Sequence, residues 1–175
     1  MLNFYKKINN KNISKKSGFA VLETILYISF FAILSIVVIN SMITMMRSFK
    51  ETKIQSELIQ GSSILEKVSR EVRQAYAINS ISENDLKLNT KDDAGVNKTV
   101  RFVLSGNDVQ YFENDVLTGN LNPNNVSVSE LTFTQIITVE GSAVKITLTI
   151  SSTNDSLGRT ADFYDTVVLR GDYQN

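Results

Sequence analysis

The chain has 175 residues, 42% of them hydrophobic and 21% charged, with one proline and no cysteine, histidine or tryptophan. This length suits one ordinary domain, and the missing residue types exclude a Ser-His-Asp or Cys-His nucleophile pair, a Cys/His zinc site, an iron–sulfur cluster and a disulfide framework. The 18 basic and 18 acidic side chains cancel, yet the first 18 residues contain five lysines and no acid, so the remainder has a net charge of −5.

The first 18 residues are the only basic stretch of the chain. Protein surfaces that bind nucleic acid are normally basic, whereas the chain after residue 18 is mildly acidic. No nucleic acid is therefore predicted as a partner of the isolated chain. The lysines of the leader have a better explanation in the apolar run that follows them.

Residues 19–39 read FAVLETILYISFFAILSIVVI, with Glu23 as the one charged side chain. As a helix this run extends about 31 Å, enough to cross the core of a bilayer. The preceding lysines orient it with the leader in the cytoplasm and the rest of the chain outside. A secretory signal has a shorter apolar run, roughly 7–15 residues, and a cleavage site with small residues, which Asn40-Ser41-Met42 matches poorly. We therefore expect the helix to be retained.

The start of this run also contains a recognisable motif. Residues 15–23 read KKSGFAVLE, a basic pair followed by glycine, phenylalanine and, fifth from that phenylalanine, glutamate. The motif resembles the class III signal of type IV pilins and type II secretion pseudopilins, in which prepilin peptidase cuts after the glycine and methylates the new amine. The resemblance implies leader charges at Lys15 and Lys16, cleavage between Gly18 and Phe19, N-methylation of Phe19, and Glu23 as the assembly carboxylate.

The chemistry of Glu23 gives that assignment a physical reason. Cleavage before Phe19 creates an ammonium one helical turn from the carboxylate, and each charge is costly alone in hydrocarbon. In a bundle of parallel helices the amine of one subunit can meet Glu23 of its neighbour. The alternative is a carboxylate near the interface that the helix dipole stabilises without a partner subunit. Asn40 stands where many major pilins have a helix-kinking proline, which favours a minor pilin or pseudopilin.

Beyond the apolar run, residues 41–79 keep a helical pattern. Charged side chains, among them Glu57 and Glu71, surround an apolar stripe with spacings of four and three. This pattern predicts a helix packed on a sheet of the same chain, with a parallel coiled coil as the alternative. Gly61 in this helix predicts a mild bend. The residues expected to contact the sheet are Ile54, Leu58, Leu65, Val68 and Val72.

From Ile78 onwards the pattern alternates as in strands. The clearest hairpin joins residues 99–105 and 108–113 through Gly106-Asn107, opposing Leu104 to Val109 and Phe102 to Tyr111. A second pair, 131–138 and 144–151, sets Ile137, Phe133 and Leu131 against Val144, Leu148 and Ile150. A final strand is expected at 162–170, and a short one at 86–89.

These elements define an α+β, pilin-like fold: a long N-terminal helix packed on a C-terminal antiparallel β-sheet. The expected organisation is a cytoplasmic leader (1–18), the transmembrane half of the helix (19–40), its amphipathic half (41–79) and a sheet head (80–175). Residues 61–75, GSSILEKVSREVRQA, and 163–171, FYDTVVLRG, are loosely similar to the J component of type II secretion and to W-type minor pilins.

Signals for chemistry are weak elsewhere. The segment Asp92–Asn97 has oxygen ligands that suit calcium, but its spacing misses the EF-hand pattern and favours a polar turn. No catalytic residue, metal ligand or cofactor is predicted, and an enzyme is not expected.

The resemblance implies a structural subunit of the inner membrane that joins, or primes the tip of, a type IV pilus or pseudopilus. Its partners would be prepilin peptidase, other pilin or pseudopilin subunits, the inner-membrane assembly platform and membrane lipid. The alternative is an unprocessed single-pass anchor that carries an extracytoplasmic binding or adhesion module. The sequence does not distinguish a pilus from a secretion or DNA-uptake machine.

Overall fold

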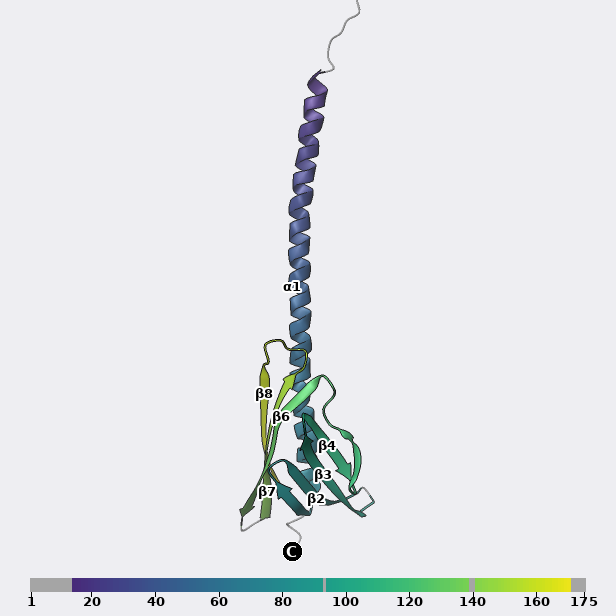
Figure 1. The fold of residues 1–175 in the computed structure, drawn as a ribbon, viewed down its shortest axis with the longest axis vertical. Coiled ribbons are helices and arrows are strands. Elements are labelled where there is room, and N and C mark those ends of the chain that lie inside the picture. Colours follow the sequence, from purple (N-terminus) through teal and green to yellow (C-terminus); the bar gives the residue numbers. More distant parts are fainter. Residues whose placement is uncertain (1–13, 93, 139–140, 171–175) are drawn as a thin grey trace, which may run out of the picture. The chain divides into compact units, whose positions relative to one another are not determined.

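The computed structural model describes residues 14–92, 94–138 and 141–170. Within these residues, a single helix, α1 (Ser14–Gln74), is followed by eight strands (Figure 1). The strands are β1 (Ala77–Ser82), β2 (Asp85–Lys91), β3 (Asn97–Ser105), β4 (Asp108–Glu113), β5 (Val116–Asn120), β6 (Val126–Thr138), β7 (Gly141–Ser152) and β8 (Thr160–Val168). The chain divides into two compact units, Met1–Phe49 and Lys50–Asn175, which are described separately.

In the first unit the described side chains are almost all exposed, although most of them are apolar. This part of α1 belongs to a helix long and apolar enough to cross a membrane. Its hydroxyl groups donate to carbonyls one turn earlier, at 2.8–2.9 Å. These donors are Thr24, Ser29, Ser35, Ser41 and Thr44. Such internal bonds suit a helix in hydrocarbon, where water cannot satisfy a polar group.

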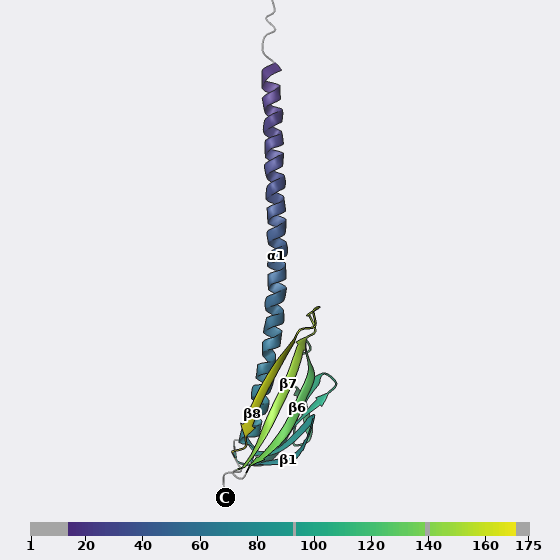
Figure 2. The ribbon, with the colours of Figure 1, turned by 90° about the vertical axis from the view of Figure 1, so that its left-hand side faces the viewer.

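The second unit contains two antiparallel sheets, ordered β1-β2-β3-β4-β5 and β6-β7-β8. Figures 1 and 2 both show β8 running beside the C-terminal part of α1. Apolar residues of α1 and of both sheets form one buried cluster, which includes Val68, Phe102 and Leu148, all fully buried. The α+β class, with a long N-terminal helix on antiparallel strands, is therefore confirmed, but the strands form two sheets where one was expected.

A buried asparagine holds the two sheets together. Asn122 accepts a hydrogen bond from the backbone N–H of Val109 in β4 at 2.8 Å and donates to the carbonyl of Val126 in β6 at 2.8 Å. Its side chain is 5% exposed, so these bonds satisfy polar atoms that burial would otherwise penalise. Backbone bonds from Val128 to the carbonyl of Asn107 and from Phe133 to the carbonyl of Glu83 join the sheets as well. The hydropathy pattern does not distinguish two such sheets from one, because these contacts are polar.

The first hairpin is confirmed in register, with Leu104 opposite Val109 and Phe102 opposite Tyr111. The second is wrong by two residues: Leu131 pairs with Leu148, and Ile137 pairs with Ser142 near the hairpin end. A two-residue shift keeps each side chain on its predicted face. Ile137 is nevertheless 76% exposed, so it does not contribute to the core.

The boundaries of several elements also differ from expectation. Helix α1 ends at Gln74, not at residue 79, and the head begins with β1, because the backbone N–H of Tyr76 already donates to the carbonyl of Asn89 in β2 at 3.0 Å. The sequence pattern also missed β5, a short edge strand containing Gly119. The predicted strands at 86–89 and 162–170 correspond to β2 and β8.

Candidate functional site

The residues of the predicted processing motif all lie within α1. Lys15, Lys16 and Gly18 lie in its first turns, and its side chains are described from Phe19 onwards. Phe19 is 80% exposed. The rest of the predicted leader, residues 1–13, lies outside the described residues.

Glu23 is exposed on the apolar helix and has one intrahelical partner. The hydroxyl of Tyr27 donates to its Oε1 at 3.1 Å, from one turn further along. Tyr27 was not singled out from the sequence, although its spacing of four residues from Glu23 was a usable signal. The bond engages one carboxylate oxygen and leaves the net charge unneutralised. Glu23 therefore still lacks a cation within the described part of this chain.

The predicted contact stripe of the helix lies in the core of the second unit. Ile54, Leu58, Val68 and Val72 are buried, at most 9% exposed, and Leu65 is half-buried against them. Gly61 continues this stripe within an uninterrupted helix. A Cβ at Gly61 would lie 2.4 Å from Cε2 of Phe163 in β8 and 2.8 Å from Cδ1 of Ile150. The glycine therefore permits a close approach of helix and sheet.

Two acids expected on the wet rim of the helix are instead buried. Glu57 is 2% exposed. Its buried carboxylate is satisfied by hydrogen bonds, since the amide of Asn154 donates to Oε1 at 2.9 Å and the hydroxyl of Ser152 donates to Oε2. Hydrogen bonds from Asn125 and Ser152 lower the pKa of Glu57. The ammonium of Lys53 lies 3.8 Å from Oε1. This carboxylate joins α1 to the ends of β6 and β7.

Glu71 is the second buried acid, at 4% exposed. Its Oε1 accepts a bond from the ammonium of Lys67 at 2.6 Å, and that ammonium lies 4.8 Å from the ring centre of Tyr111 in β4. Burial, aided by the charge of Glu71, raises the pKa of Tyr111 to about 12. The spacing pattern placed both acids outside the stripe. It could not reveal that Ser152 and Asn154 would bond Glu57, or that the ring of Tyr111 would lie against the ammonium that pairs with Glu71.

The loop between β7 and β8 is held to α1 by charge. Arg159 donates through Nη1 to Oε1 of Glu51 at 2.5 Å and through Nε to Oδ2 of Asp155 at 2.7 Å. The same guanidinium holds the pKa of Asp155 at about 2. These pairs fix the loop at the first turn of α1 within the second unit.

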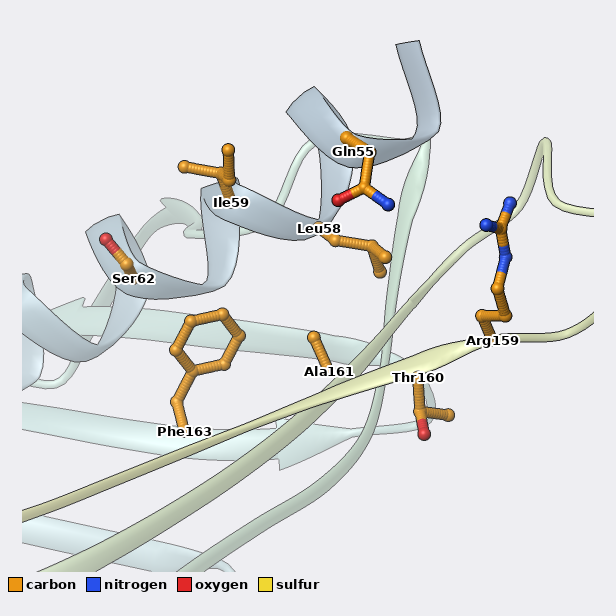
Figure 3. A pocket seen from close by; sticks show the side chains of 8 residues that line it. All are labelled: Gln55, Leu58, Ile59, Ser62, Arg159, Thr160, Ala161 and Phe163. Carbon is orange, nitrogen blue, oxygen red and sulfur yellow. The ribbon is translucent and has the colours of Figure 1, made fainter. Parts of the chain in front are cut away.

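A groove lies between α1 and β8 (Figure 3). Its volume is about 480 Å³, and apolar side chains from both elements, including Leu58, Ile59 and Phe163, line it. A second hollow of about 340 Å³ shares Ser62 with the first and extends towards Arg73. Sequence analysis did not predict this groove, because it depends on the edge position of β8.

The loop at Asp92–Asn97 forms a turn through its first carboxylate. Oδ1 of Asp92 accepts backbone bonds from Ala94 at 3.0 Å and from Val96 at 2.8 Å. Among the described residues, no group of three acids, histidines or cysteines could hold a metal ion.

Comparison of the chain with protein-family models, curated proteins and solved structures finds no match. The functional argument therefore depends on the residues of this chain.

Proposed function

We propose that this protein is a minor pilin or pseudopilin: a subunit that prepilin peptidase trims and N-methylates at Phe19, and that then joins a filament through its helix. One observation carries the proposal. The motif KKSGFAVLE overlaps the start of an apolar run of membrane length, residues 19–39, whose one charged residue is Glu23.

The side chains of the first unit support this function. Large apolar residues are exposed all round the helix, as at Phe31 (72%) and Ile36 (61%), and such a surface requires lipid or other helices around it. Lipid would surround the helix in the membrane, and the helices of neighbouring subunits would surround it in the filament. Glu23 fits such a bundle because the freed amine of a neighbour would neutralise it.

The second unit supports a structural role for the head. The side chains of α1 from Ile54 onwards belong to the core of this unit. Glu57 and Arg159 also join loops between the strands to the same helix. In the proposed subunit this head is exported and presented on the filament, while the leader stays in the cytoplasm until it is removed. The assembly platform of the inner membrane and the other subunits are the expected partners.

Substitution of Glu23 tests the assembly role. We expect Glu23→Ala to leave membrane insertion intact or to improve it, and to reduce incorporation into filaments sheared from cells. Thr24→Ala is the matched control, because it removes a neighbouring polar group whose hydroxyl bonds only within its own helix, to Ala20. Equal incorporation of Glu23→Ala and Thr24→Ala would remove the role assigned to Glu23.

The anchored binding module makes the opposite prediction about processing. If the chain keeps its leader in cells that contain prepilin peptidase, filament entry has no basis and the anchored module becomes the better assignment.

A further inference from the structure

Strand β8 has an unpaired edge. It is the last strand in the order β6-β7-β8, and within the described residues it pairs with β7 alone. An edge strand presents free backbone N–H and C=O groups at alternate residues, which can pair with another extended chain. β8 is nine residues long, so this edge is not a short one.

The flank of α1 beside this edge is incompletely covered. Ile59 is 66% exposed, and Phe163 and Ala161 of β8 are half-buried at the same groove. Figure 3 shows the side chain of Leu58 between the helix and the strand. A further strand beside β8 would direct alternate side chains onto this flank. The apolar hollow of about 480 Å³ lies where one of these side chains would enter.

The adjoining hollow offers unpaired cations. Arg70 and Arg73 line it, both are exposed, and neither forms an ion pair within the described part of the chain. Asp165, which also lines it, is engaged on both oxygens, by the hydroxyl of Ser69 at 2.6 Å and by the backbone N–H of Thr166 at 2.8 Å. Glu66 is the other acid there. The unused groups are therefore mainly guanidinium donors, which bind carboxylates well.

We propose that the groove between α1 and β8 is a docking site for an extended segment of a partner protein, which adds a fourth strand at β8, inserts an apolar side chain against Leu58 and Phe163, and places a carboxylate on Arg70 and Arg73. This is strand addition with a side-chain pocket for specificity. It does not depend on processing at Gly18 or on the Glu23 contact, so it can fail or hold separately from the proposed function.

The geometry also specifies the spacing within the partner. Ala161 borders the apolar hollow and Asp165 the cationic one, four residues apart along β8. At about 3.3 Å per residue this separation is about 13 Å, and residues four apart in a strand lie on the same face. The docking segment therefore needs an apolar residue and an acid four positions apart.

The test uses the full chain in detergent micelles and a fluorescent, threonine-rich nine-residue peptide. The peptide has leucine at its third position and glutamate at its seventh, and binding is followed by anisotropy. We expect saturable binding that weakens about tenfold with Ile59→Gln and again with the pair Arg70→Gln and Arg73→Gln. Ile137→Gln and Lys145→Gln, exposed residues of β6 and β7, are matched controls and should bind as the parent does.

Two comparisons separate this mode from nonspecific adhesion. Moving leucine to the fourth position puts it on the opposite face from glutamate and should abolish most of the binding. Amide hydrogen exchange should slow at β8 on peptide binding and stay unchanged at β5, an edge strand of the five-stranded sheet. Equal binding of both peptides, or no change in exchange at β8, would overturn the proposal. So would a chain that binds no peptide and instead dimerises in sedimentation through Ile59, because the face would then join copies of this chain.

Discussion

The two units use the same residue types in one helix and expose them very differently. In the first unit Ile36 is 61% exposed and Phe31 is 72% exposed, whereas in the second unit Ile54 and Ile64 are each 2% exposed. The difference follows from the pattern, since the first stretch is apolar on every side and the second has a stripe that matches a sheet. Hydrophobic residues of the first unit therefore do not stabilise the head, and those of the second unit do.

The largest expected change in stability compares the same substitution, isoleucine to alanine, at one site in each unit. Ile64→Ala removes buried side-chain volume and should lower the free energy of unfolding of the head by about 2–5 kcal/mol. Ile36→Ala, in the same helix, should leave it unchanged. Urea unfolding of the full chain in micelles, followed by near-ultraviolet circular dichroism, measures both. Similar losses at the two sites would mean that the units are not energetically distinct.

Glu57→Gln should have the next largest effect, about 1–3 kcal/mol, because buried hydrogen bonds to Ser152 and Asn154 are disturbed. The folded state holds the pKa of Glu57 below its ordinary value of 4.5. Its ionised form therefore contributes stability that is present above about pH 4.5 and is lost as the pH falls through the folded-state pKa. The glutamine variant should lose this part of the acid dependence, whereas Glu66→Gln, an exposed acid of the same helix, should retain it.

Gly61→Ala sharpens the contrast at a single contact. The added Cβ would clash with Phe163 and Ile150, but alanine favours the helix and both clashing atoms are the ends of side chains. We expect a net loss of about 1 kcal/mol in the stability of the head. Gly106→Ala is not a suitable control because its φ is +62°, so Ser63→Ala, on the exposed side of α1, serves instead. A gain in stability with Gly61→Ala would show that the helix–sheet contact tolerates the methyl group.

The smallest effect is electrostatic and local. Arg159→Gln should raise the pKa of Asp155 from about 2 towards its ordinary value of 3.8, because the guanidinium is the main cause of the depression. Carboxyl chemical shifts in an NMR titration measure this change. An unchanged pKa would assign the depression to the backbone bond from Leu157 instead.

Much of the fold could be predicted because the spacing of apolar residues along the sequence reflects which side chains are buried. The stripe at Ile54, Leu58, Val68 and Val72, and the hairpin register of Phe102 with Tyr111, follow from spacing alone. The division into two sheets and the burial of Glu57 could not be predicted. The two sheets meet through contacts such as the backbone N–H of Phe133 with the carbonyl of Glu83, and Glu57 is buried against the hydroxyl of Ser152. The members of each pair are far apart in sequence and meet only in the fold.

The candidate sites differ in the same way. The proposed processing motif is a local string, so residues 15–23 could be singled out directly from the sequence, and the structure adds only the bond from Tyr27 to Glu23. The groove between α1 and β8 is made by elements about a hundred residues apart, Gln55–Arg73 and Arg159–Asp165. No local pattern predicts it, because an unpaired strand edge exists only once the sheet order is known.

The most direct test of the central claim is the intact mass and N-terminal sequence of the protein purified from membranes of cells that contain prepilin peptidase. The account predicts a chain that begins at N-methylated Phe19 and retains its apolar helix. A chain that still begins at Met1 in those cells, or one cut beyond residue 40, would contradict it.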